Sequence, residues 1–472
     1  MTEISRGMCA LACLLLAGPA VIPAAAAPAT MRVDFYHAGN SSEERFSLDR
    51  VVVEPLPWPG SLARPIDDTN RGKYLFEVAD AASGRLLYSR GFSSIYGEWE
   101  TTGEAQQMRR TFSESLRFPA VDRPATITIR KRNAVNAFVD AWSFGLDPAN
   151  KFIERGVRVE AGAVIALHDA GPPDTKLDLL ILGDGYTAAE RQKFERDARR
   201  LTDVLFATSP FKERSGDINV WGLVPPAAAS GISRPSQGIF RRSPVGTTYD
   251  AFDSERYILT FENKAFRDLA ANAPYDVVEI LTNTETYGGG GIFNLFSIAA
   301  ASNLWAPYLF IHEFGHHLAG LADEYYTSDV AYLPAAERVE PWEPNVTALA
   351  DPASVKWRDL LTAGTALPTP WPKTEFEAYT RDVQARRRAL RAASRPEDEM
   401  NALFREEMAR DTALLNTGPH AHRVGAFEGA NYESRGYYRP QADCIMFTRD
   451  DVGFCAVCRR AIAQIVDLYS AR

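Results

Sequence analysis

Residues 311–325 read IHEFGHHLAGLADEY. This stretch predicts a helix that ends near Gly320, because a glycine just after an apolar run is a common helix end. Residues four apart face the same side of a helix, so His312 and His316 can each direct an imidazole nitrogen to a single cation. Glu313 projects roughly 100° round the helix from His312. Its carboxylate is therefore close enough to reach a water on the metal without being a ligand.

The chemistry that this spacing predicts is hydrolysis by a zinc-activated water. Zinc lowers the pKa of a bound water toward neutrality, and a carboxylate beside it takes the proton. Glu313 is the predicted general base, and it would then deliver the proton to the leaving amine. We therefore expect one catalytic zinc ion, Zn2+, as the cofactor.

A catalytic zinc site also needs a third protein ligand, with the fourth position left open. Asp323 is the predicted third ligand, because the turn at Gly320 lets the chain swing back under the metal. A related zinc-peptidase pattern, H-E-x-x-H-x-x-G-x-x-H/D, places its third ligand six residues after the second histidine. Here that place is Ala322, which cannot bind a metal, and Asp323 follows it. Glu324 is the adjacent alternative.

The remaining histidines near or beyond this segment are weaker candidates. His317 points off the metal face of the predicted helix, so we expect it to be a surface group or a support for a ligand. His420 and His422 are distant alternatives for the third ligand.

Length and composition predict two globular domains. The chain has 472 residues, of which 46% are hydrophobic and 24% charged, and this is comfortable for two packed cores. The net charge is −9. No basic field is therefore present to attract a phosphate backbone, and we predict no nucleic-acid partner.

Residues 1–27 have the layout of an export signal. Arg6 lies in a short n-region, an apolar run follows, and a tract of small residues ends near Ala27. Pro19 and Pro23 interrupt the apolar run, whereas a membrane span needs roughly 20 unbroken apolar residues. We predict cleavage near Ala27, no transmembrane segment in the mature chain, and a secreted, periplasmic or cell-surface location.

An odd number of cysteines in an exported chain allows at most one internal disulfide and a free thiol. Cys9 and Cys13 leave with the signal, so Cys444, Cys455 and Cys458 remain. We predict one disulfide that fastens the C-terminal segment, with one free thiol. A zinc knuckle would need a fourth ligand, which the neighbouring sequence does not offer.

Residues 28–170 are predicted to form an antiparallel β-sandwich that serves as an accessory domain. Short β-rich runs are separated by turn-forming residues, which is typical of a small sandwich. These runs are Arg32–Tyr36, Arg50–Val53, Lys73–Val78, Thr126–Arg130 and Val157–Leu167. The region has no catalytic cluster, and residues 171–174 are predicted to be a linker.

Residues 171–472 are predicted to form an α/β or α+β catalytic domain. Leu177–Leu182 is a mostly apolar strand, and Ala188–Phe206 follows at helical spacing. Further predicted strands are Asp217–Leu223, Tyr257–Phe261 and Val277–Leu281. Asp276–Thr286 is a candidate sheet edge for pairing with an extended peptide, and a plain edge strand is the alternative.

Several ordered motifs accompany the histidine segment between residue 177 and the C-terminus. They are Leu182–Thr187, Tyr287–Gly291, Phe427–Tyr432, Gly436–Pro440, Cys444–Met446 and Phe454–Cys458. With these motifs, the chain resembles the IgA-type zinc metallopeptidases, in which H-E-x-G-H is followed by G-L-A-D-E-Y. The N-terminal sandwich resembles the accessory domain of that family.

The resemblance implies a metzincin-like zinc peptidase domain, with a twisted sheet over the active-site helix and Met446 in a turn beneath the zinc. It implies a secreted endopeptidase with a protein or peptide substrate, although not immunoglobulin A in particular. A phenol is expected to stabilise the oxyanion. Tyr438 is the predicted residue, with Tyr437 and Tyr432 as alternatives.

Two other functions remain open at the level of sequence. One is a zinc hydrolase that acts on a non-peptide amide or ester, for which the site chemistry is the same. The other is a non-catalytic surface adhesin or glycan-binding protein with a vestigial zinc site. Glu313 argues against the second, because a purely structural metal site has no use for a base beside the metal.

Overall fold

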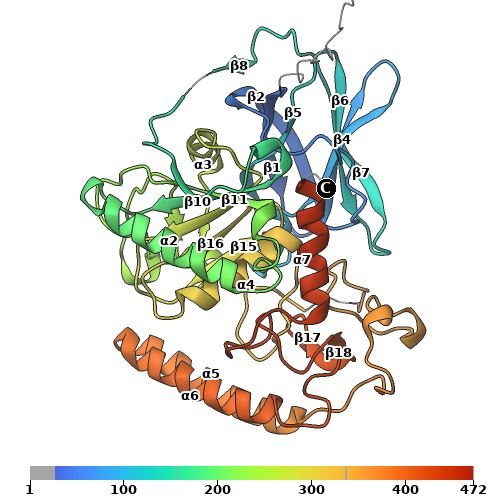
Figure 1. The fold of residues 1–472 in the computed structure, drawn as a ribbon, viewed down its shortest axis with the longest axis vertical. Coiled ribbons are helices and arrows are strands. Elements are labelled where there is room, and N and C mark those ends of the chain that lie inside the picture. Colours follow the sequence, from blue (N-terminus) through green and yellow to red (C-terminus); the bar gives the residue numbers. More distant parts are fainter. Residues whose placement is uncertain (1–26, 157, 335–336, 471–472) are drawn as a thin grey trace, which may run out of the picture.

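The N-terminal part of the chain is built from two four-stranded sheets (Figure 1). The computed structural model describes residues 27–156, 158–334 and 337–470, so the predicted export signal lies outside the described residues except for its last position. One sheet has the order β5 (Arg110–Pro119), β1 (Ala29–Gly39), β2 (Glu44–Pro57) and β8 (Glu154–Arg155). The other has the order β4 (Leu86–Phe92), β3 (Tyr74–Asp80), β6 (Ala125–Arg132) and β7 (Phe138–Leu146).

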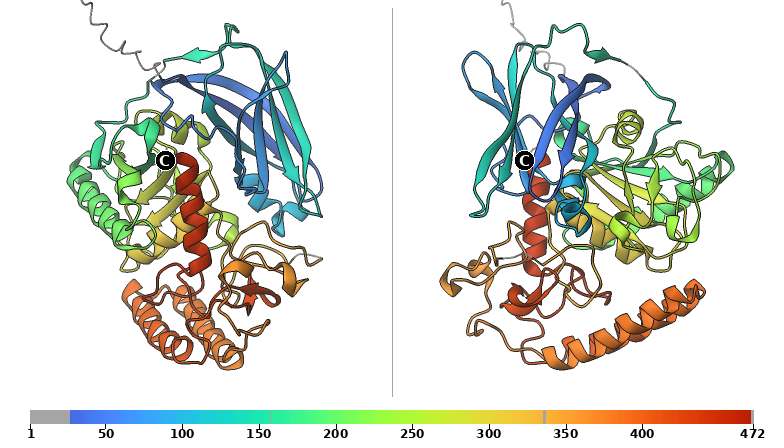
Figure 2. Two further views of the ribbon diagram at one scale, coloured as in Figure 1. Left: turned by 45° about the vertical axis from the view of Figure 1, so that its right-hand side comes forward. Right: turned by 180° about the vertical axis from the view of Figure 1, so that it is seen from behind.

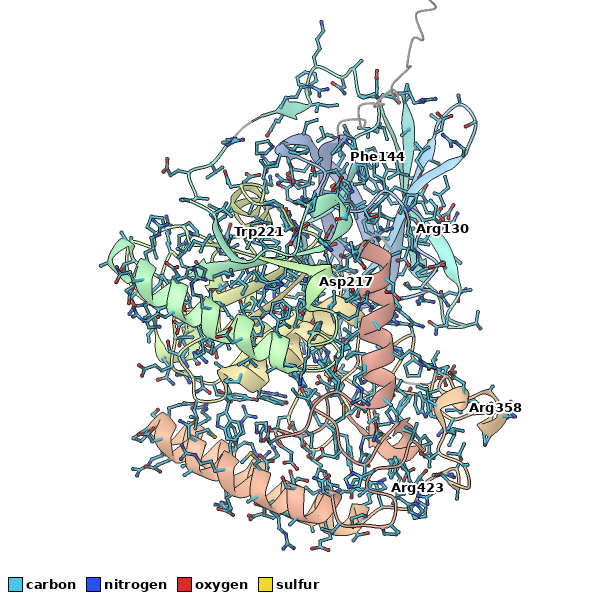
Figure 3. The ribbon with its side chains drawn as sticks, in the orientation of Figure 1. Arg130, Phe144, Asp217, Trp221, Arg358 and Arg423 are labelled. Carbon is cyan, nitrogen blue, oxygen red and sulfur yellow. The ribbon has the colours of Figure 1, made fainter. Side chains whose placement is uncertain are left out.

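Alternating side chains give these two sheets a shared apolar core. Every second residue of β3 is buried, as expected for a strand with one face on a core. Phe35, Phe76 and Ile127 come from different strands and join one hydrophobic cluster. On the outer face, Arg130 pairs with carboxylates of neighbouring strands (Figure 3). The predicted β-rich N-terminal domain is therefore confirmed.

The second part of the chain is centred on a six-stranded mixed sheet. Its order is β15 (Gly289–Ile292), β16 (Phe296–Ala300), β14 (Val277–Thr282), β10 (Leu177–Asp184), β11 (Ile218–Leu223) and β9 (Ile165–His168). The four inner strands are parallel, and the two edge strands run antiparallel to their neighbours. Residues 171–174 are the predicted linker, but β9 lies before them in the chain and already belongs to this sheet.

Helices cover both faces of this sheet (Figure 2). One face packs on α2 (Arg191–Ala207), α4 (Ala306–Ala319) and α7 (Ala456–Tyr469), and the other packs on α3 (Asn263–Ala270). Alternate residues of β10 serve the two faces, since Leu179 lies in one core and Leu180 in the other. The predicted mixed α/β character of this part is confirmed.

Smaller elements complete the chain after the sheet and its helices. A helical hairpin lies at the far end from the sandwich (Figure 1). The elements are the hairpin helices α5 (Lys373–Ala392) and α6 (Glu397–Leu415), and the short strands β12 (Thr247–Thr248), β13 (Leu259–Thr260), β17 (Phe427–Ala430) and β18 (Glu433–Arg439). No helix in the described ranges combines the length and apolar character that crossing a bilayer requires.

The prediction that Asp276–Thr286 forms a sheet edge is wrong. Its strand, β14, lies between β10 and β16 and is hydrogen-bonded on both sides. Every residue of β14 is buried, as expected for an inner strand of a sheet covered on both faces. On this side of the sheet, the edge strand is the glycine-rich β15.

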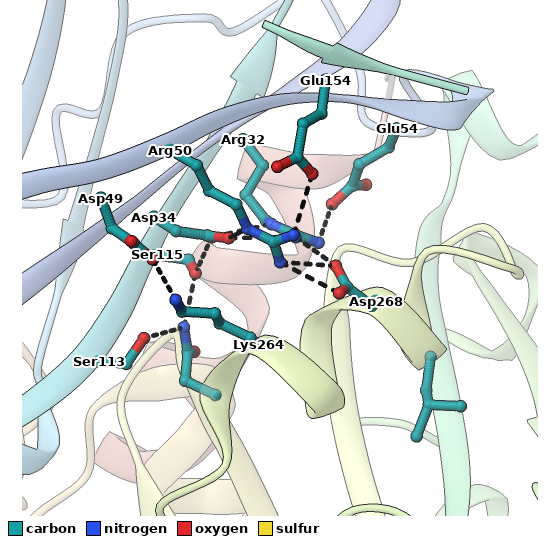
Figure 4. A network of polar contacts seen from close by, with 12 residues as sticks. Arg32, Asp34, Asp49, Arg50, Glu54, Ser113, Ser115, Glu154, Lys264 and Asp268 are labelled. Carbon is teal, nitrogen blue, oxygen red and sulfur yellow. Dashed lines mark hydrogen bonds and ion pairs between the residues drawn. The ribbon is translucent and has the colours of Figure 1, made fainter. Parts of the chain in front are cut away.

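The two parts of the chain pack together through both polar and apolar contacts. Asp268 of α3 accepts hydrogen bonds from Arg32 and Arg50 of the sandwich (Figure 4). The short helix α1 (Ile95–Trp99) inserts Tyr96 and Trp99 into the core beneath the six-stranded sheet. The sandwich is thus attached through a buried core and not only through a linker.

Candidate active site

Helix α4 presents the histidines, and its C-terminal end redirects the chain beneath them. The helix ends at Gly320, which takes the left-handed conformation with φ 60°, so the predicted helix end is confirmed. The Gly320 N–H donates to the carbonyl oxygen of His316 at 3.0 Å. A Cβ at Gly320 would lie 2.6 Å from the ring of Trp342, and both restrictions favour glycine.

Three ligand atoms converge beside this helix. The two Nε2 atoms of His312 and His316 are 3.2 Å apart. Asp323 Oδ1 lies 3.0 Å from Nε2 of His312 and 3.2 Å from Nε2 of His316. Ligands about 2.0–2.1 Å from a tetrahedral ion lie about 3.3 Å from one another. The triangle therefore has close to the dimensions of three zinc ligands with the fourth position open.

The imidazoles are oriented by backbone carbonyls on their far sides. His312 Nδ1 lies 2.9 Å from the carbonyl oxygen of Ile445, and His316 Nδ1 lies 2.6 Å from that of Leu321. A carbonyl oxygen can only accept, so each Nδ1 carries the proton. Each Nε2 lone pair then faces the shared centre, which is the arrangement that metal-binding histidines use.

Asp323 is held in place by a tyrosine from a distant turn. The Tyr432 hydroxyl donates to Asp323 Oδ2 at 2.6 Å. Tyr432 itself has φ 64°, an uncommon conformation for a residue other than glycine. Asp323 Oδ1 is buried and has no hydrogen-bond donor among the described residues. A buried carboxylate oxygen without a donor fits a cation at this position.

A protonated His316 and the Asp323 carboxylate stabilise each other as close opposite charges, and a bound metal ion would take the place of the proton on Nε2. Burial alone raises the pKa of Asp323, but His316 beside it brings that pKa well below its usual value. Burial alone lowers the pKa of His316, but Asp323 raises it to about 9. Burial raises the pKa of Glu313, and the neighbouring His312 and His316 offset part of that rise.

The glycine strand β15 passes directly over Glu313 and His316. A Cβ at Gly289 would lie 3.0 Å from Oε1 of Glu313. A Cβ at Gly291 would lie 2.4 Å from the Glu313 carbonyl oxygen and 2.9 Å from Cβ of His316. Only glycine therefore lets the edge strand approach the active-site helix this closely.

We expect Gly291→Ala to lower the free energy of unfolding by about 1–3 kcal/mol, because the added methyl group overpacks the helix. Zinc affinity should fall too, since His316 must shift. Denaturant unfolding and metal titration measure both effects. Gly145→Ala is the matched control, because no atom lies within 4 Å of a Cβ there. Equal unfolding free energies and zinc affinities for the two variants would contradict this packing argument.

The ligand triangle opens on a cavity of about 660 Å³ between the two parts of the chain. The lining residues from the second part include Glu313, Arg256 and Tyr432. Glu98, from α1 of the first part, also lines it. The hydroxyls of Tyr257 and Tyr332 donate to Glu98, and burial raises the pKa of Glu98 to about 7. The sequence of the first part predicts no such site residue, because Glu98 reaches the cavity only through the packing of α1 against the second part.

The tyrosine prediction fits the structure less well. Tyr438 is not among the described residues that line the cavity, whereas Tyr432 and Tyr437 are. The backbone of Tyr438 pairs with Thr347, and burial and Glu428 raise the pKa of its phenol. Among the three tyrosines, Tyr432 comes nearest to the ligands, through its bond to Asp323.

The other predicted alternatives lie away from the histidine triangle. His317 is buried instead of exposed: its Nε2 accepts from the Val278 N–H at 3.0 Å, and its Nδ1 donates to the Ile292 carbonyl oxygen at 3.1 Å. Burial lowers the pKa of His317 to about 3, so it is neutral. His420 and His422 are not among the cavity-lining residues in the described ranges.

Glu324 and the cysteines form a separate group behind the triangle. The Glu324 carboxylate accepts from Asn345 Nδ2 at 2.9 Å and faces the sulfur of Cys458. The predicted disulfide is wrong, because Cys444, Cys455 and Cys458 are all free thiols. Asp323 and not Glu324 therefore lies beside the histidines.

Comparison with protein families gives two matches. A family model described as IgA Peptidase M64 matches residues 165–466. A model described as Peptidase M64 N-terminus matches residues 24–143. A comparison with curated proteins finds no match. The two family matches together cover nearly the whole chain, in the order that the sequence resemblance implied.

Proposed function

This chain belongs to the IgA peptidase M64 family, and from that premise we propose that it is a secreted zinc-dependent endopeptidase. The observation that carries the proposal is the triangle of His312 Nε2, His316 Nε2 and Asp323 Oδ1, with sides of 3.0–3.2 Å. Glu313 lies beside this triangle and faces the cavity. Export rests on the signal-like sequence at residues 1–27.

The residues present fit a zinc ion. Two imidazole nitrogens and a carboxylate oxygen form a common set of ligands for catalytic zinc. Asp323 Oδ1, which has no hydrogen-bond donor among the described residues, lies beside the histidine nitrogens. When bound, the zinc ion would act as a Lewis acid that activates a water for attack on a peptide carbonyl. His312, His316 and Asp323 would hold it, and Tyr432 would fix the orientation of Asp323.

Glu313 performs the proton transfers in this proposal. Its half-buried carboxylate accepts a proton from the attacking water and then donates that proton to the leaving amine nitrogen. The absence of a side chain at Gly289 lets the neighbouring strand lie close to this carboxylate. The cavity binds an extended segment of the substrate, with walls from both parts of the chain.

A metzincin-like arrangement is the fold that we propose for this domain. Cys444–Phe447 forms a turn, with the Phe447 N–H donating to the Cys444 carbonyl oxygen at 2.8 Å. Met446 in that turn is fully buried against α4, where its sulfur lies 3.1 Å from the Cβ position of Gly315. The same turn supplies the Ile445 carbonyl to His312.

Cleavage of a peptide library tests the proposed function. We expect the zinc-loaded chain to generate new peptide N-termini, detected by mass spectrometry. A chelator should abolish cleavage, because it removes the ion from the histidines and Asp323. Added zinc should restore cleavage, because the same ligands bind it again. Full cleavage by the metal-free chain would overturn the proposal. Hydrolysis of esters or non-peptide amides, with peptides left intact, would favour the alternative hydrolase.

A further inference from the structure

Four side chains that can bind a metal meet behind the histidine triangle. They are Glu324, Cys444, Cys455 and Cys458, and their ligand atoms all lie within 4.8 Å of one another. All four residues are buried, with at most 4% of any one exposed, and none is among the described residues that line the cavity. We propose that this cluster binds a second, structural zinc ion through three thiolates and one carboxylate.

The spacing of the ligand atoms is that of coordination. Cys444 Sγ lies 3.9 Å from Cys458 Sγ, and Cys458 Sγ lies 3.5 Å from Glu324 Oε1. In a tetrahedral zinc site, two sulfurs are about 3.8 Å apart, and a sulfur and an oxygen are about 3.5 Å apart. A disulfide would bring two sulfurs to about 2.05 Å. The fourth ligand that a zinc knuckle requires is thus supplied by Glu324, far away in the sequence.

Backbone donors around the sulfurs favour thiolates. The Cys455 N–H donates to Cys444 Sγ at 3.3 Å, and the Cys458 N–H donates to Cys455 Sγ at 3.4 Å. Cys455 is also the N-cap of α7, where the helix dipole stabilises negative charge. The C-x-x-C spacing of Cys455 and Cys458 is one that structural zinc sites use.

The carboxylate is positioned, and one of its oxygens has no donor. Asn345 Nδ2 donates at 2.9 Å to Glu324 Oε1, the oxygen that faces Cys458 Sγ and that keeps a second lone pair for an ion, while Glu324 Oε2 is buried without a hydrogen-bond partner among the described residues. Arg439 lies close enough to interact electrostatically with Glu324, but its guanidinium donates to the carbonyl oxygens of Gly429 and Ala442. Arg439 therefore offsets part of the excess negative charge and leaves the carboxylate to the ion.

The second ion would fix the loops that build the catalytic site. Glu324 is adjacent to Asp323, and its N–H donates to the Met446 carbonyl oxygen at 2.8 Å. Cys444 is adjacent to Ile445, whose carbonyl orients His312. One ion would thus hold together the loop that carries the third ligand and the turn beneath the first ion. The ion would also protect the thiols from oxidation in the oxidising environment that an exported protein meets.

Cobalt spectroscopy tests this second site without any assay of activity. The full chain, produced in cobalt-supplemented, zinc-depleted medium, should contain two cobalt ions and show thiolate-to-cobalt charge-transfer absorption in the near ultraviolet. Cys458→Ser should lose this absorption and one ion. His316→Ala, the matched control, should also lose one ion and yet retain the absorption, because its remaining ion is bound by sulfur.

The wild-type measurement keeps the test decisive if a cysteine variant does not fold. A single cobalt ion without charge-transfer absorption would overturn the second site, as would a disulfide among the three cysteines found by mass spectrometry of the folded chain. Neither result depends on peptide cleavage. Failure of the proposed peptidase function and failure of the second site are therefore distinguished.

Discussion

Glu313→Gln is expected to lower kcat by about 10²–10⁴-fold, the range typical of a lost general base, while the histidine-bound zinc is retained. The amide keeps the volume of the carboxylate but cannot accept the proton of the attacking water. The ligand triangle does not include Glu313: its sides join His312, His316 and Asp323. Peptide cleavage rates and metal content, measured on the same preparation, separate the loss of the base from the loss of the ion.

The matched control for this substitution is Glu195→Gln, on the exposed surface of α2. Glu195 pairs only with Arg199 among the described residues, and an exposed pair of this kind contributes little to stability. The Glu195→Gln variant should cleave peptides at the wild-type rate. If Glu313→Gln lost zinc to the same extent as His316→Ala, the separation of base and ligand would be wrong.

Asp323→Ala and Glu324→Ala are expected to remove different ions. Asp323→Ala should reduce affinity for the histidine-bound ion by more than the 10–100-fold typical of a group that only orients a ligand. The thiolate-to-cobalt absorption should persist in this variant. Glu324→Ala should weaken the sulfur-bound ion and leave the histidine triangle able to bind metal, because the two carboxylates face different clusters.

Metal titration with cobalt, followed by absorption, measures both affinities in one experiment. Tyr432→Phe supplies an intermediate control, because it removes the hydrogen bond to Asp323 Oδ2 but keeps the ligand; its affinity should fall by about 10–100-fold. If Glu324→Ala weakened the histidine-bound ion more than Asp323→Ala did, the assignment of Asp323 as the third ligand would fail.

Local periodicity explains why the helix and its motif were predictable. His312 and His316 are one turn apart, and Gly320 ends the helix four residues later. These relations depend on helix geometry alone, which short segments of sequence specify. Local patterns also specify a run of apolar residues as a strand and an apolar stripe as a helix. The predicted strand Leu177–Leu182 and helix Ala188–Phe206 are accordingly confirmed as β10 and α2.

Sheet order was less accessible to sequence analysis. The β14 segment was predicted as an edge strand. Whether a strand lies inside a sheet or at its edge depends on which other strands pair with it, and the residues of the strand itself do not specify those partners. The neighbour that covers β14 is β16, and it follows in the chain after the true edge β15. The glycines of β15 were noticed, yet their reason, close contact with Glu313 and His316, depends on helix-on-strand packing.

The sequence by itself determined the helix with its pair of histidines, because one turn of helix sets their spacing, and it determined the family, because several short motifs occur in a fixed order along the chain. Only the tertiary structure decided that Asp323 faces the histidines while Glu324 faces the cysteines. It alone brought Tyr432 to Asp323 across 109 positions and Cys458 to Glu324 across 134 positions. Past the end of a helix, the direction of a side chain is set by the loops packed against it, and no local period encodes that packing.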